Sequence, residues 1–361
     1  MSSAGPDAAT GLAQPHTGAV LAVVQPGIGT TVQDAGRRGH RHHGLPVAGW
    51  LDGPLARAAL ALLGQPGDAA VLELRGAGTV LAVRRGPVQI ALAGRIGAQV
   101  LGAEGVRRPL PAWQTATLLA GEQLQLGPAE TGCAYLAVAG GLALAPAFGS
   151  RSSDWRAGLA GVLGRPPQPG DELPCGAAAP PAAHEWQCAE PWAAGEGPIR
   201  VLPGPQDDHF SPEAIARFYG EAWQATAAQD RMGLRFEGPP LAHRTPAAAD
   251  IVSDGVTPGA IQVPANGQPI VLLADGQTVG GYPKIATVIQ ADLPRLAHLR
   301  PGTRVRFAAV DRAEARRAAQ QAAERWQRWL AGRSPARPPG GIDKAALYAA
   351  NLISGIIDAR G

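Results

Sequence analysis

The stretch DIVSDGVTPGAIQVPANGQPIVLLADGQTVGGYPKIATVIQA, from Asp250 to Ala291, alternates apolar runs with loops. Two of the runs, Gly259–Val263 and Pro269–Ala274, flank the pair Asn266-Gly267, which is typical of a β-hairpin turn. A further run follows at Lys284–Gln290. We therefore predict three short strands in this stretch.

A glycine-rich polar loop, Asp275–Pro283, precedes the third predicted strand. Such a loop between apolar strands indicates close backbone approach to a ligand or partner. Lys284 ends the loop, and the only other lysine among the 32 Lys and Arg residues is Lys344. Because a compact ammonium can shift its pKa when buried, Lys284 is a candidate catalytic residue. The alternative is that Lys284 simply begins a strand in solvent.

Several other polar side chains have no predicted turn or helix cap that would explain them. Asp275 could act as a base or orient the lysine, and Arg231 could neutralise an oxyanion or a phosphorylated intermediate. Gln277 and Thr278 could hydrogen-bond an amide or a carboxylate. The other candidate substrate-binding residues are Gly280, Gly281, Tyr282, Gln262, Asp254, Asp34 and Arg37. The charged pairs could instead be structural ion pairs across a barrel.

Residues 20–140 have the pattern of a β-barrel or sandwich, because Gly or Pro separates short apolar runs at spacings of about 8–12 residues. One helix is predicted at Gly53–Leu63, where Asp52 can cap the start and Gly64 the end. Asp52 thus has a structural explanation, which we favour over catalysis. The predicted strands are Val71–Leu74, Thr79–Val83, Val88–Leu92, Ala98–Leu101, Thr115–Leu119, Gln123–Leu126 and Cys133–Ala139.

Composition divides the chain into four parts. Residues 1–19 are small and polar and are interpreted as a disordered tail. Residues 20–195 form an N-terminal β domain that ends in a connector rich in Gly, Pro and Ala. Residues 196–310 form a second β domain, and residues 311–361 form a helical extension.

Helix signals mark the second half of the chain. Ser211 can cap a helix after the strand Ile199–Leu202, and Asp311 with Glu314 resembles a capping box. A second helix in the extension is predicted at Asp343–Ile357. The arginines between residues 311 and 337 are interpreted as a solvated face, since no nucleic-acid motif accompanies them. The apolar stripe predicted for the first extension helix is Ala315, Ala319, Ala322, Trp326 and Leu330.

Several kinds of site are missing from the sequence. It has no GxxxxGK[ST] phosphate loop, GxGxxG dinucleotide motif, GxSxG elbow or HExxH zinc helix. The cluster His40–His43 has no acidic or cysteine ligand nearby in sequence, so we expect no metal. No apolar run is long enough for a membrane span, and Cys133, Cys175 and Cys188 lack C-x-x-C spacing. We expect a cytoplasmic protein that contacts neither membrane nor nucleic acid.

Six motifs occur in order along the chain: Gln25–Arg37, Gly44–Asp52, Gly149–Asp154, Leu202–Gln206, Asp230–Gly233 and Ser253–Leu296. Together they resemble the biotin-dependent carboxyltransferase-like family. This family includes the KipA-type C subunit of prokaryotic 5-oxoprolinase, the proteins once called allophanate hydrolase subunit 2, and part of urea carboxylase. The chain departs from the family pattern at Gly276, where Arg is usual, and at Val279, where Thr is usual.

The resemblance implies a fold of two cyclophilin-like β-barrel domains and a role in an enzyme complex. The leading expectation is the C subunit of an ATP-dependent 5-oxoprolinase, a hydrolase that opens 5-oxo-L-proline to L-glutamate, with no activity of the chain alone. Its partners would be a KipI-like subunit, which shares the site, and a LamB/YcsF-like subunit. ATP could lie on one of these partners, since this chain lacks a nucleotide motif.

Two alternatives stay open. The first is a carboxyltransferase component for urea or another amide. Its biotin would come from a separate carrier, because no lysine here lies beside a methionine as in a biotin carrier. The second is a regulatory antagonist that binds a KipI-like inhibitor of a histidine kinase.

Overall fold

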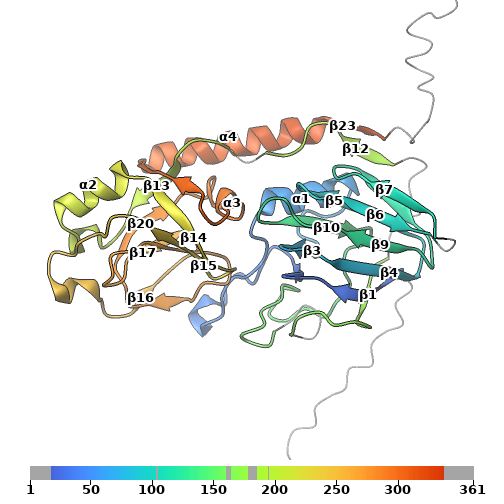
Figure 1. Ribbon diagram of the computed structural model, residues 1–361, viewed down its shortest axis with the longest axis horizontal. Coiled ribbons are helices and arrows are strands. Elements are labelled where there is room, and N and C mark those ends of the chain that lie inside the picture. The colour runs from blue at the N-terminus through green and yellow to red at the C-terminus, as the bar shows by residue number, and fades with distance from the viewer. Residues whose placement is uncertain (1–17, 103–104, 160–163, 178–184, 194, 337–361) are drawn as a thin grey trace, which may run out of the picture.

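The computed structural model describes residues 18–102, 105–159, 164–177, 185–193 and 195–336 of the 361-residue chain. Figure 1 shows two β units side by side, with a long helix running along both of them. The predicted mainly β fold with a few helices is confirmed. Among the helices of the described residues, none has the length and hydropathy needed to cross a bilayer.

The N-terminal unit contains two antiparallel sheets that share one hydrophobic core, to which Leu81 and Ile90 contribute from opposite sheets. The six-stranded sheet has the order β11 (Glu172–Pro174), β1 (Val20–Pro26), β4 (Thr79–Arg85), β9 (Gln123–Leu126), β6 (Ala98–Leu101) and β7 (Arg107–Leu110). The five-stranded sheet has the order β2 (Thr31–Gln33), β3 (Val71–Leu74), β10 (Ala134–Val138), β5 (Val88–Ala93) and β8 (Thr115–Leu118). Every strand predicted between residues 71 and 139 is therefore present.

The C-terminal unit is an eight-stranded sheet that closes almost into a barrel, because its two edge strands are separated in sequence by Arg306 alone. The three strands predicted between Asp250 and Ala291 are β17, β18 and β20, and they are neighbours in the sheet. Its order is β21 (Arg304–Val305), β14 (Trp223–Gln229), β15 (Gly233–Glu237), β18 (Ile270–Leu272), β17 (Ala260–Gln262), β20 (Lys284–Val288), β13 (Ile199–Pro203) and β22 (Phe307–Ala309). A separate pair consists of β16 (Asp254–Gly255) and β19 (Val279–Gly280).

Side-chain caps define where three of the helices begin. Asp52 accepts a hydrogen bond from the Leu55 backbone, and Ser211 accepts one from Ala214. Asp311 forms the predicted capping box with Glu314. The helices are α1 (Gly53–Leu62), α2 (Pro212–Gly220), α3 (Leu293–Leu296), α4 (Arg312–Ala331) and the 3-10 turns η1 (Arg41–His43), η2 (Asp207–His209) and η3 (Pro246–Ala249).

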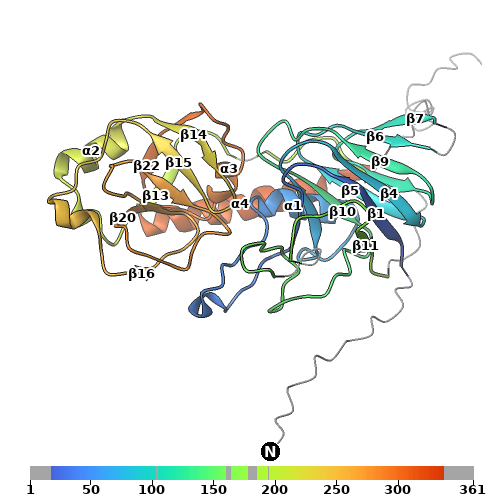
Figure 2. The same ribbon diagram turned by 60° about the horizontal axis from the view of Figure 1, so that its bottom comes forward.

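Helix α4 lies against both units in both views (Figures 1 and 2). Trp329 packs edge-on against Trp113 of the N-terminal unit, with ring centroids 6.0 Å apart, and against Trp192 at 6.5 Å. The predicted apolar stripe lies on the half-buried face of α4, where Trp326 and Leu330 pack against the core, and the fully buried residues of this helix are Ala318 and Trp329. Ala319, Ala322 and Trp326 also line a cavity, which leaves them partly exposed.

The connector between the units contributes two strands that the sequence did not reveal. They are β11, which pairs with β1, and β12 (Trp186–Cys188), which pairs with β23 (Arg333–Pro335) beyond α4. Their short length and the surrounding Gly and Pro residues hide them from a pattern search. The predicted second helix of the extension, Asp343–Ile357, lies outside the described residues.

Candidate functional site

Lys284 begins β20 and is buried, with 4% of its surface exposed. Its Nζ donates to Asp254 Oδ2 at 2.7 Å, and its backbone N–H donates to Gln206 Oε1 at 3.2 Å. The hydrogen bond from Lys284, followed by that from the Gly255 backbone, lowers the pKa of the Asp254 carboxyl. The solvent alternative for Lys284 is wrong, since a buried ammonium here faces a carboxylate that is more than half exposed.

Two glutamines lie beside this ion pair. Gln262 is 1% exposed, and its Oε1 accepts from Gln277 Nε2 at 3.2 Å. Its Nε2 donates to the Tyr282 carbonyl at 3.5 Å. Gly280 permits this approach, because a Cβ there would lie 2.5 Å from Gln262 Nε2. We call the set Lys284, Asp254, Gln206, Gln262 and Gln277 the lysine cluster.

Arg41 brings the N-terminal unit to the lysine cluster. Its Nη2 donates to the carbonyls of Val256 and Gln277. Burial lowers the pKa of the Arg41 guanidinium. The Thr278 carbonyl accepts from the Val256 backbone at 3.0 Å, so Arg41 holds a loop that already carries predicted site residues. The role of Arg41 could not be predicted from the sequence, because Val256 and Gln277 lie more than 200 residues away in the chain.

Arg231 and Asp275, both predicted as catalytic, form a buried ion pair at the junction of the units. Arg231 Nη2 and Nε donate to the two Asp275 oxygens at 2.8 Å each. Arg231 Nη1 donates to Glu73 Oε1 at 2.5 Å, and Nη2 also donates to the Gly49 carbonyl at 2.6 Å. Burial alone lowers the pKa of Arg231, but the Glu73 and Asp275 carboxylates outweigh it and raise the pKa.

Asp34 and Arg37 form another buried cluster, with the motif Gly149–Asp154. Asp34 Oδ1 accepts from Ser150 Oγ at 2.6 Å and from Ser152 Oγ at 2.7 Å. Arg37 is fully buried, and its Nη2 donates to the Ser152 carbonyl. Burial lowers the pKa of Arg37 although nearby carboxylates, first Asp154, oppose this shift. These contacts join two motifs that lie far apart in sequence.

His298 of the C-terminal unit also contacts the N-terminal unit, and nothing in the sequence around it predicted this role. His298 Nε2 lies 2.9 Å from Asp52 Oδ2, and Nδ1 lies 3.1 Å from Thr131 Oγ1. Gly132 permits this contact, since a Cβ there would lie 1.6 Å from the Ala297 carbonyl oxygen. Asp52 therefore caps α1 and also contacts the C-terminal unit.

The structure thus separates the predicted site residues into three groups. The lysine cluster and its loop hold most of the predicted substrate-binding residues, with Gly281 fixed by a 2.8 Å hydrogen bond from Ile251 to its carbonyl. The pair Arg231 and Asp275 lies at the start of the same loop, on the side that faces the N-terminal unit. Asp34 and Arg37 belong to the N-terminal unit alone.

The lysine cluster contains groups suited to recognising an amide or a developing negative charge. It offers a buried cation, three carboxamides and an exposed carboxylate beside a glycine-containing loop. Among the described residues, no group of three or more His, Cys, Asp or Glu side chains could hold a metal.

The family model described as "Carboxyltransferase domain, subdomain A and B" matches residues 43–309. The chain belongs to this carboxyltransferase family. Its similarity to one member, the C subunit of Escherichia coli 5-oxoprolinase, is 36% identity over 304 residues, which cover 83% of this chain and 94% of that protein. The predicted family is confirmed.

The family also includes larger relatives of which this chain matches a part. It is 29% identical over 306 residues to a putative urea carboxylase of Emericella nidulans, covering 81% of this chain and 24% of that protein. The crystal structure of the K. lactis urea amidolyase shares the fold, with a TM-score of 0.75 and 24% identity. That match covers 86% of this chain and 20% of the amidolyase chain.

Proposed function

We propose that this chain is the C subunit of an ATP-dependent 5-oxoprolinase and that the lysine cluster forms part of its site. One observation carries the proposal: the 36% identity to the corresponding Escherichia coli protein extends over 94% of that protein. The match extends over most of both proteins, which supports a corresponding role for this chain. The geometry of the lysine cluster supports the same reading, because carboxamides suit recognition of a lactam.

The proposed reaction starts from a poor electrophile. Transfer of a phosphoryl group from ATP to the lactam oxygen makes the ring carbon electrophilic. Water then adds to that carbon, the ring C–N bond breaks with a proton moving to nitrogen, and a second water releases phosphate. The products are L-glutamate, ADP and phosphate.

The roles proposed for the chain's own residues follow from where they lie. Lys284 would stabilise negative charge on the lactam oxygen, since it is a buried cation. Gln262 and Gln277 would bind the amide group. Asp254 is more than half exposed, with a pKa lowered by Lys284, so it is ionised at neutral pH and would hold the Lys284 ammonium in position. Arg231 and Asp275 would hold the loop in position.

The remaining parts of the reaction would come from partner proteins. The chain has no phosphate-loop motif, so we propose that ATP binds to a LamB/YcsF-like partner or to a KipI-like partner. The lysine cluster would then form one half of a site shared with the KipI-like partner. The cluster member Asp254 is exposed, and so are Tyr282 and Val279 of the adjoining loop. These exposed side chains leave the loop accessible to such a partner.

The test is 5-oxoproline-dependent ADP release by the complex purified with its native partners. We expect Lys284→Met to reduce the rate about a hundredfold while the complex stays intact. Arg95→Met is the matched control, because it removes an exposed cation that pairs with the exposed Glu130. A wild-type complex without ADP release would contradict the proposed reaction, and an unimpaired Lys284→Met complex would contradict the role of the lysine cluster.

A carboxyltransferase for urea or another amide is the second candidate. The family description and the similarity to a putative urea carboxylase favour it. It requires biotin delivered by another chain, and the carboxamides of the lysine cluster could also bind the ureido group of biotin. Activity that depends on a biotin carrier and on urea would support it. Stable binding to a KipI-like protein without any turnover would instead support the regulatory alternative.

A further inference from the structure

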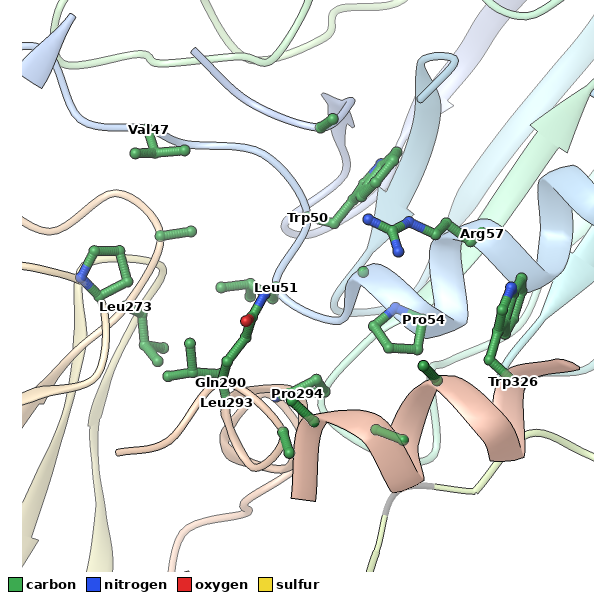
Figure 3. Close-up of a pocket in the computed structure, with 18 of the residues that line it drawn as sticks. Val47, Trp50, Leu51, Pro54, Arg57, Leu273, Gln290, Leu293, Pro294 and Trp326 are labelled. Carbon is green, nitrogen blue, oxygen red and sulfur yellow. The ribbon is translucent and has the colours of Figure 1, made fainter. Parts of the chain in front are cut away.

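A cavity of about 510 Å³ lies where α1, α4 and the C-terminal unit meet (Figure 3). Its volume falls in the range of about 300–1,000 Å³ that is typical of small-molecule sites. The cavity is separate from the lysine cluster, since no member of that cluster lines it. Part of the apolar stripe of α4, namely Ala319, Ala322 and Trp326, lines this cavity.

Three arginines surround this cavity, and no acidic side chain of the described residues lines it. They are Arg38, Arg57 and Arg325, from a loop, from α1 and from α4. In the described parts of the chain, none of the three forms an ion pair with a carboxylate. Arg325 Nε is also buried and has no hydrogen-bond partner within those parts. Like charges gathered around one cavity without a counter-charge indicate a site for an anion.

The rest of the cavity wall is mainly apolar and aromatic, with Gln290 as a polar member. Trp50 is held by a hydrogen bond from its Nε1 to the Gln33 carbonyl at 3.0 Å. Arg57 lies over the Trp50 ring, 5.9 Å from its centroid, and Figure 3 shows both side chains on one side of the space. Trp326 lies on the α4 side. The other apolar residues of the wall include Pro54, Leu293, Pro294, Ala319, Ala322 and Ala323.

We propose that this cavity binds an organic anion with an apolar or aromatic body. The carboxylate or phosphate group of the ligand would contact the arginines, and its body would lie against the tryptophans and the alanines of α4. Because the wall combines residues of both units and α4, such a ligand would bridge all three. This site goes beyond the proposed function and does not depend on it.

The direct test uses a fluorescent anion, 1-anilinonaphthalene-8-sulfonate, with uncharged N-phenyl-1-naphthylamine as its neutral counterpart. We expect the anion to bind the wild-type chain with one dominant site. Arg57→Gln and Arg38→Gln should each weaken anion binding about threefold to tenfold and leave the neutral probe unaffected. Arg107→Gln, which removes an exposed arginine of β7, is the matched control and should change neither.

A filling variant makes the location specific. Ala322→Phe places a ring in the cavity from α4 and should abolish binding of both probes, with near-UV circular dichroism confirming that the fold is retained. Displacement of the fluorescent anion by phenylacetate would support a carboxylate ligand, and displacement by AMP would support a phosphate ligand. The proposal would be overturned if the Arg57→Gln and Arg38→Gln variants bound the fluorescent anion as tightly as the wild-type chain. It would also be overturned if neither phenylacetate nor AMP displaced the anion.

Discussion

Arg231 Nη1 of the C-terminal unit lies 2.5 Å from Glu73 Oε1 of the N-terminal unit, and both side chains are buried. Glu73 Oε2 accepts in turn from Tyr135 Oη at 2.7 Å and from the Leu51 backbone at 3.0 Å. Asp275 is the second carboxylate that pairs with the same guanidinium. The two units are therefore held together by a buried cation with two carboxylate partners, and the predicted loop of the site begins at one of them.

We expect Arg231→Met to destabilise the chain by about 3–5 kcal/mol, because it leaves the Glu73 carboxylate buried without its cation. Urea unfolding followed by tryptophan fluorescence measures the change. Arg95→Met, in an exposed pair with Glu130, is the control and should have little effect. Equal stability of the two variants would show that the buried pair does not hold the units together.

We expect Lys284→Met to raise the pKa of Asp254 toward the ordinary carboxyl value of about 3.9, because the hydrogen bond from Lys284 is the main cause of its lowered pKa. The ion pair stabilises the folded chain above that value, and this contribution is lost as the pH falls through the lowered native pKa. Carbon-13 NMR of the Asp carboxyls follows the titration. Asp171, whose pKa is lowered by Arg165, is the internal control and should not move.

We expect Gly132→Ala to destabilise the contact between the units by about 1–3 kcal/mol or more, because a Cβ would overlap the Ala297 carbonyl oxygen. Thermal unfolding measures the effect. Gly67→Ala is the matched control, since a Cβ at Gly67 meets no atom of the described residues within 4 Å. If both variants have the same melting temperature as the wild type, the close approach of the Gly132 and Ala297 backbones is not needed for stability.

We expect the three cysteines to resist modification in the folded chain at pH 8. All three are buried, and burial raises the pKa of Cys175 to about 12 and that of Cys133 well above its ordinary value. Ellman's reagent should react slowly with the native protein and with all three thiols after denaturation in urea. Rapid reaction of the native thiols would contradict the burial described here.

Local signals in the sequence predicted the parts of the fold that local chemistry decides. The cap residues Asp52, Ser211 and Asp311 begin their helices as predicted, because a cap needs only side chain and backbone within a few residues. The hairpin around Asn266 likewise joins β17 to β18. Strands β11, β12 and β23 escaped prediction because each is short and is stabilised by a distant partner.

The candidate site was predictable only in part for the same reason. Lys284 could be found because lysine is rare in this chain, and the loop before it could be found because of its glycines. That Arg231 pairs with Glu73, and that Arg41 reaches Gln277, depends on how the two units pack. No periodicity or spacing within one segment carries that information.

The pairing of β12 with β23 can form only late in synthesis. Strand β12 leaves the ribosome before any strand of the C-terminal barrel, whereas β23 follows α4. During synthesis, the edge of β12 that pairs with β23 therefore stays unpaired until the whole barrel and α4 have emerged from the ribosome. A chain that stalls before residue 333 therefore lacks this strand pairing, although it already contains the residues that join the two units through Arg231, Arg41 and His298.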